Sequence, residues 1–99
     1  MEKGGCVYIL TNKHHTTLYT GVTSNLVARI TQHREQYYQN SFAARYNCRK
    51  LVFYRAFATI EEAIAEEKRI KGGSRAKKEL LINAVNPLWN DLWEEVKHW

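Results

Sequence analysis

The sequence contains little cysteine, proline or glycine: two, one and five residues respectively among 99. Cys6 and Cys48 do not form the Cys-x-x-Cys spacing of a zinc cluster, and we expect both thiols to be reduced. The chain shows no linker-like segment and no internal repeat. We therefore predict one domain over residues 1–99, with a core at about 6–82 and a helical tail at 83–99.

Long apolar runs are also missing. The first residues, Met1–Gly5, lack the apolar run of a signal peptide. Every apolar stretch is far shorter than the ~20 residues needed to span a bilayer. We expect a cytoplasmic protein with no membrane contact.

Positive charge and apolar side chains are plentiful. Lysine and arginine exceed the acidic residues by five, and hydrophobic residues make up 44% of the chain. That apolar content is sufficient for a packed core and argues against disorder. The positive excess suits a polyanionic partner such as nucleic acid, although many small basic proteins bind nothing specific.

The hydrophobic pattern predicts both strands and helices. Strands are expected at 6–10 and 18–22, as a hairpin, and at 50–57. Helices are expected at about 26–37, 60–71 and 75–85, with a short helix or ordered tail at 88–99. The predicted fold is α+β: a small three-stranded antiparallel sheet flanked by helices.

Capping residues mark the predicted helix ends. Ser24 or Asn25 can begin the first helix, and Thr59 with Glu62 forms a capping box for the second. Gly72 is placed to end the second helix in the left-handed region.

The two C-terminal segments carry apolar residues at helical spacing. One side of the helix begun at Ser74 would hold Ala76, Leu80, Leu81 and Ala84. The tail carries three tryptophans, at 89, 93 and 99. Their spacing favours packing of the tail on the domain; the alternatives are stacking on bases and a protein interface or self-association.

A carboxylate interrupts the apolar stripe of the second helix. The stripe runs through Ile60, Ala63, Ile64 and Ile70, with Glu67 near its centre. A carboxylate facing a core is costly unless it is paired or bound to a metal. Glu67 is therefore either in a salt bridge or at the rim, or it is a ligand of Mg²⁺, which prefers hard oxygen donors.

The first helix and the hairpin also place polar groups on inward positions. His33 is either a hydrogen-bonded core histidine or a functional group, and Arg29 is either a surface residue or a phosphate clamp. Tyr8 and Tyr19 are packing residues unless both hydroxyls point toward that helix, which the hairpin register decides. Gly21 indicates a bulge or a close approach by another group, a substrate phosphate among the possibilities.

These residues resemble a known family. Val7-Tyr8, followed by Tyr19-Thr20-Gly21, is similar to the paired motifs of GIY-YIG endonucleases, and Arg29, His33 and Glu67 match the positions of that family's later site residues. The likeness is closest to small single-domain members related to the N-terminal nuclease domain of the bacterial excinuclease C subunit.

The resemblance implies a metal-dependent endonuclease that hydrolyses phosphodiester bonds in DNA, in repair or recombination. Glu67 would hold one Mg²⁺ or Mn²⁺ ion, and Arg29 would contact the phosphodiester. Tyr8, Tyr19 or His33 would orient or deprotonate the attacking water, and the choice among the three stays open.

Some positions depart from the family pattern. Cys6 replaces the first glycine, and Val7 and Thr20 replace the two isoleucines. The late asparagine of the family could be Asn86 or Asn90, and the spacing does not decide between them.

Backbone phosphate contacts are expected from Gly21 and from the positive cluster around Gly72-Gly73, which is otherwise a solvated helix junction. The residues of that cluster to which we assign phosphate contacts are Lys71, Arg75, Lys77 and Lys78. The main alternative is a non-catalytic nucleic-acid-binding module with the same fold. Retention of Glu67 beside both tyrosines and Arg29 favours the nuclease, because binding alone does not require a metal carboxylate.

Overall fold

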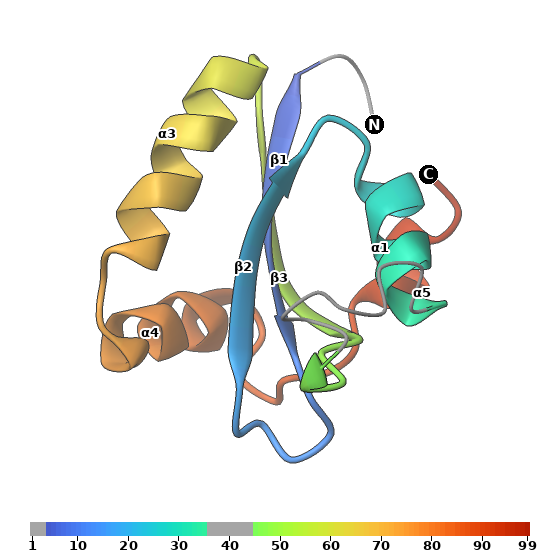
Figure 1. Ribbon diagram of the computed structural model, residues 1–99, viewed down its shortest axis with the longest axis vertical. Coiled ribbons are helices and arrows are strands. Elements are labelled where there is room, and N and C mark those ends of the chain that lie inside the picture. Colours follow the sequence, from blue (N-terminus) through green and yellow to red (C-terminus); the bar gives the residue numbers. More distant parts are fainter. Residues whose placement is uncertain (1–3, 36–44) are drawn as a thin grey trace.

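A three-stranded antiparallel sheet forms the centre of the molecule, as predicted (Figure 1). The computed structural model describes residues 4–35 and 45–99. The strands are β1 (Gly5–Thr11), β2 (Leu18–Thr23) and β3 (Lys50–Phe57), in the order β2-β1-β3. Every residue of the central strand β1 is buried, whereas β2 lies at an edge.

Helices cover both faces of this sheet (Figure 1). They are α1 (Leu26–Arg34), α3 (Ile60–Lys71), α4 (Arg75–Val85) and α5 (Trp93–Val96). Helix α1 and the short α5 lie on one side, and α3 and α4 lie on the other. Helix α1 ends at Arg34, with Glu35 as its C-terminal cap, and residues 36 and 37 of the predicted helix fall outside the described residues. The last helix is much shorter than the predicted 88–99 segment. Within the two described ranges, no helix has the length and apolarity required to cross a bilayer.

The two faces of β1 build two separate cores, because successive side chains of a strand point to opposite sides. Cys6, Tyr8 and Leu10 pack toward α1. Val7 and Ile9 pack toward α3 and α4. A side chain on one face can therefore meet a group from the other face only around the outer edge of the sheet.

The predicted caps form at both helix starts. Asn25 caps α1, with Oδ1 accepting the N–H of Ala28 at 3.1 Å. Thr59 and Glu62 form the reciprocal capping box of α3. Both begin a helix at the position that its sequence signal predicts.

The expected left-handed end of α3 is wrong. Gly72 has φ −74° and donates its N–H to the carbonyl of Lys68 at 3.0 Å, so the last turn continues in the right-handed region. Gly73 then donates to the carbonyl of Ile70, which tightens the end of the helix without a positive φ.

The predicted inward sides of α3 and α4 are partly wrong. Ile64 is 37% exposed and Leu80 is 69% exposed, whereas Ile82 is fully buried. Ala76 and Ala84 are exposed as well. Helix α4 contacts mainly β3, so a narrow stripe through Ile82 reaches the sheet, displaced from the predicted one.

Two of the three tryptophans pack on the domain, as the helical spacing favoured. Trp89 lies against the core beneath α3 and α4, and Trp93 lies against the core beneath α1. Trp99 is 48% exposed and meets Tyr54 edge-on, with ring centroids 5.3 Å apart.

Candidate active site

The hairpin register brings Tyr8 directly opposite Gly21. The Tyr8 ring crosses above this glycine, toward the edge of the sheet. A Cβ built at Gly21 would overlap Cζ and Oη of the phenol and would lie 2.9 Å from Cε2. The predicted close approach at Gly21 is therefore real, and the approaching group is Tyr8.

Three aromatic side chains from different elements meet on the α1 face of the sheet. The hydroxyl of Tyr8 on β1 lies 3.0 Å from Nε2 of His33 on α1. The ring of Tyr19 on β2 lies 6.3 Å from that of Tyr8 and 5.4 Å from that of His33, between centroids. The register thus places both tyrosines on the face that carries His33, and we call these three residues the aromatic cluster.

Both hydrogen-bonded groups of the aromatic cluster are neutral at pH 7. Burial raises the pKa of Tyr8, and the nearby Tyr19 raises it further, against the opposing charge and hydrogen bonding of Arg29. Burial, followed by the charge of Arg29, lowers the pKa of His33 to about 4. The proton in the Tyr8–His33 hydrogen bond lies on either partner according to the histidine tautomer.

Arg29 supplies positive charge beside this neutral cluster. It lies on α1 one turn before His33, is half-buried, and acts on both titrating groups. A guanidinium next to uncharged hydrogen-bonding groups attracts an anion, and within the described ranges 4–35 and 45–99 no carboxylate forms an ion pair with Arg29.

Glu67 lies across the edge strand from the aromatic cluster. Helix α3 covers the opposite face of the sheet, and in Figure 1 the strand β2 runs between α3 and α1. Glu67 is 9% exposed, and its Oε2 pairs with Nζ of Lys71 at 3.0 Å. The salt-bridge interpretation from the sequence is therefore realised.

A hollow of about 310 Å³ at the outer edge of β2 connects the two faces. It is lined by Leu18, Tyr19, Thr20, Lys71 and Lys78. Tyr19 belongs to the aromatic cluster, and Lys71 is the partner of Glu67. We call this space the edge hollow. A ligand in it would touch Tyr19 of the aromatic cluster and Lys71, the partner of Glu67.

Thr20 is a residue of the edge hollow that the sequence analysis missed. Its side chain is 4% exposed, and Oγ1 has no hydrogen-bond partner among the described residues. An unpaired buried hydroxyl is costly and therefore unusual. The signal in the sequence is a polar residue at an inward strand position, where the family pattern has isoleucine.

The four cationic residues predicted to contact phosphate fall in different places. Lys71 and Lys78 line the edge hollow, while Lys77 is exposed and lines a separate pocket. Arg75 is occupied by the fold itself: it pairs with Glu79 at 2.8 Å and donates to the carbonyls of His15 and Thr16 in the β1–β2 loop.

Asn86 and Asn90, the two candidates for the late asparagine of the family, lie in one turn. Asn86 donates through Nδ2 to the carbonyls of Val52 at 3.0 Å and Asn90 at 2.9 Å. Its Oδ1 accepts the N–H of Asn90 at 3.1 Å. These contacts fix the chain that follows α4 to β3.

The ligand set suits a magnesium-type ion better than zinc. No three histidine, cysteine, aspartate or glutamate side chains gather into a possible metal site in the described part of the chain. Zinc sites in proteins use three or four such ligands. One carboxylate, Glu67, fits Mg²⁺ or Mn²⁺, which retain several waters and use substrate phosphate oxygens.

The family model of the GIY-YIG catalytic domain matches residues 4–80. The chain belongs to the GIY-YIG family. Membership agrees with the three-stranded antiparallel sheet and the helices that flank it. GIY-YIG domains are nucleases as a family, so nucleic acid is the substrate class that membership implies for this domain.

One solved structure of a similar protein has the same architecture. The GIY-YIG domain described here is 34% identical to the UPF0213 protein BH0048 from Bacillus halodurans, solved by solution NMR. The match covers 90% of this chain and 94% of that one, with a TM-score of 0.55. Among curated proteins, none matches this chain.

Proposed function

We propose that this GIY-YIG domain is an endonuclease that hydrolyses phosphodiester bonds in DNA, with one Mg²⁺ or Mn²⁺ ion held by Glu67. One observation carries the proposal: the edge hollow touches both halves of the site. On one side its lining includes Tyr19, which belongs to the neutral aromatic cluster beside Arg29. On the other side its lining includes Lys71, which pairs with Glu67. A phosphodiester at this edge would meet positive charge from both sides of β2. DNA repair or recombination is the setting we propose, in the cytoplasm.

Each residue of the site has a separate role in the proposed cleavage. Arg29 binds the phosphodiester and stabilises the charge that develops on its oxygens. Tyr19, half-buried at the hollow, contacts the attacking water. Glu67 would hold the metal ion, which would supply charge neutralisation at the phosphate and at the leaving oxygen.

A proton relay follows from the order of the aromatic groups. Tyr8 is fully buried, so it does not contact water directly, but it hydrogen-bonds Tyr19 and lies 3.0 Å from His33. Its raised pKa makes it a poor base by itself. We propose His33 as the final acceptor, because its ring is uncharged above about pH 4 and an anion bound at Arg29 would offset the charge that helps to lower its pKa.

The ion pair between Glu67 and Lys71 favours a second candidate, a nucleic-acid-binding module that does not cut. In that case the lysine would be the permanent partner of the carboxylate, at 3.0 Å, and no ion would displace it. The fold and the positive edge would serve binding alone.

Cleavage of labelled single-stranded, duplex and branched DNA, and of matched RNA, tests the proposal. The wild type should cut with Mg²⁺ or Mn²⁺, and Glu67→Gln and Arg29→Ala should cut at least ~100-fold more slowly. Glu61→Gln is the matched control, because Glu61 is an exposed carboxylate on the same helix.

Two results would decide against the nuclease. Equal cleavage by the wild type and Glu67→Gln would remove the carboxylate from the mechanism. Tight binding by the wild type without cleavage, under all metal conditions, would favour the binding module.

A further inference from the structure

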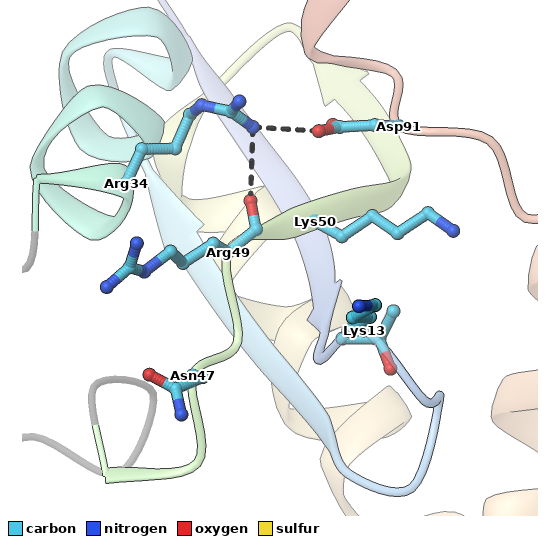
Figure 2. A pocket seen from close by; sticks show the side chains of 7 residues that line it. Lys13, Arg34, Asn47, Arg49, Lys50 and Asp91 are labelled. Carbon is cyan, nitrogen blue, oxygen red and sulfur yellow. Dashed lines mark hydrogen bonds and ion pairs between the residues drawn. The ribbon is translucent and has the colours of Figure 1, made fainter.

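A second basic hollow lies at the end of the sheet where β1 finishes and β3 begins (Figure 2). Its volume is about 550 Å³. We call it the basic pocket, and it is lined by Thr11, Lys13, Arg34, Asn47, Arg49, Lys50 and Asp91. None of these residues takes part in the proposed cleavage.

The lining carries four cationic side chains and one carboxylate, a net charge of +3. The carboxylate of Asp91 is fully engaged: Oδ2 pairs with Nη1 of Arg34 at 2.8 Å, and Oδ1 accepts the N–H groups of Leu51 and Trp93. Figure 2 shows this pair at one side of the pocket, away from Lys13. Asp91 therefore balances Arg34 and leaves the other three charges uncompensated.

Lys13 and Arg49 are exposed, and their side chains make no ion pair with the described residues. Lys50 donates to Nε2 of His15 at 3.0 Å. Burial and the neighbouring charges of Lys50 and Arg75 lower the pKa of His15, so this imidazole is neutral and orients the lysine without cancelling its charge.

The walls of the pocket are fixed by the fold. Arg34 also donates to the backbone carbonyl of Arg49 at 3.4 Å, which ties the end of α1 to the entry of β3. Lys50 is itself the first residue of β3. Arg34 and Lys50 are therefore held in place before an anion binds, and they lose little entropy when it does.

The pocket lies along the same helix as the candidate active site. Arg34 follows His33 directly and lies five residues after Arg29, which is about 7.5 Å further along α1. These five residues also turn the helix by about 140°, so a nucleic-acid strand bound at Arg29 would have to pass around the end of α1 to place another of its phosphates in the pocket.

We propose that the basic pocket binds a phosphate group of the nucleic-acid strand, away from the bond that is cut. Uncompensated lysine and arginine side chains are the usual partners of phosphate oxygens. The inference rests on the proposed function in one respect, that nucleic acid is the ligand. It does not require the domain to cut.

Binding of a labelled single-stranded oligonucleotide, measured by fluorescence anisotropy over a range of salt concentrations, tests this pocket. The double variant Lys13→Gln/Arg49→Gln should bind about tenfold more weakly. The slope of log K against log salt should become shallower by about 1.4, the value for two lost phosphate contacts on a single strand.

The matched control removes two exposed positive charges elsewhere, in Arg55→Gln/Lys97→Gln. Arg55 lies near the opposite end of β3, and Lys97 follows α5. Arg55 pairs with Glu66 and Lys97 pairs with Glu94, so the control removes charges that are already compensated and should bind within about threefold of the wild type. Equal weakening of the two double variants, or wild-type binding by the pocket variant, would overturn the assignment. Unchanged melting temperatures show that both variants fold.

Oligonucleotides with and without a terminal phosphate separate two sources of the ligand. If the pocket holds a terminal phosphate, its removal weakens the wild type and leaves the pocket variant unaffected. If the pocket holds an internal phosphate, removal of the terminal phosphate changes the affinity of neither protein. If the pocket variant binds as tightly as the wild type and the wild type cuts, only the pocket proposal is refuted. If the pocket variant binds more weakly and the wild type does not cut, only the endonuclease proposal is refuted.

Discussion

The phenol ring of Tyr8 occupies the space into which a side chain at Gly21 would project. The two residues are cross-strand partners. Because Gly21 has no side chain, the Tyr8 ring can extend across it toward Tyr19. We predict that Gly21→Ala displaces the phenol, abolishes most cleavage and lowers the free energy of unfolding by about 1–3 kcal/mol. Urea unfolding and cleavage rates measure the two effects.

Gly73→Ala is the control for that substitution. A Cβ at Gly73 would find its nearest neighbour, the carbonyl oxygen of Ile70, at 3.4 Å, which is ordinary contact. This variant should keep its stability within about 0.5 kcal/mol and its activity. Wild-type cleavage by Gly21→Ala would show that the position of the Tyr8 ring is unimportant.

Local signals in the sequence predicted the elements well. The hairpin, the strand at 50–57 and the capping box at Thr59 are short-range features, and each has its own residue pattern. The inward sides of α3 and α4 were predicted less well, because the contact surface of a helix depends on how it crosses the sheet. Ile64 and Leu80 satisfy the helical period and yet remain exposed.

The candidate site was predictable where one element carries the signal. Glu67 and His33 stand out as polar residues on apolar stripes, and both are buried. The basic pocket was not predictable, since Lys13, Arg34 and Lys50 come from a loop, a helix end and a strand start. No periodicity connects such residues, and only the fold brings them together.

The hydroxyl of Thr20 is buried without a hydrogen-bond partner among the described residues. Thr20→Val replaces this group by a methyl of the same shape, and we expect the free energy of unfolding to rise by about 1 kcal/mol. Thr23→Val is the matched control, because the Thr23 hydroxyl donates to the carbonyl of Asn25 at 3.1 Å and accepts its N–H at 3.0 Å. The control should lose stability, and a loss in both variants would mean that Thr20 has a partner.

His33 should make stability depend on pH. The pKa of His33 is lowered from 6.5 to about 4 in the folded chain, so between these values the unfolded chain binds more protons. Protonation of His33 therefore opposes folding. The free energy of unfolding keeps its full value above pH 6.5 and falls by up to about 3 kcal/mol as the pH drops toward 4. Chemical unfolding of the wild type and His33→Gln across this range measures it: the variant should show a flatter profile, whereas the exposed His98→Gln should follow the wild type. Parallel profiles for all three proteins would contradict the assignment.

Arg75 should stabilise the β1–β2 loop instead of binding nucleic acid. Its guanidinium donates to the carbonyls of His15 and Thr16 and pairs with Glu79. Arg75→Ala should cost about 1 kcal/mol of stability and speed amide hydrogen exchange in the loop, because partly exposed pairs contribute modestly. Lys77→Ala, an exposed neighbour on the same helix, should change neither quantity. Weakened oligonucleotide binding with unchanged hydrogen exchange in Arg75→Ala would instead support its predicted phosphate contact.

Lys71 and a divalent ion should compete for the same carboxylate. Nζ of Lys71 lies 3.0 Å from Oε2 of Glu67, so an ion that takes this oxygen must displace a partner of like charge. Lys71→Met removes the competing charge and keeps the apolar stem. The lysine side chain is half exposed, so solvent screens the pair, which is worth about 1 kcal/mol. We therefore expect Mn²⁺ to bind Lys71→Met about two- to fivefold more tightly than the wild type, measured by calorimetry in the absence of nucleic acid. Lys68→Met, at the adjacent exposed position of α3, controls for the general loss of positive charge. If Lys68→Met gains as much Mn²⁺ affinity as Lys71→Met, the effect is a long-range one of lost charge. If Lys71→Met binds Mn²⁺ more weakly than the wild type, Lys71 and the ion do not compete for Glu67.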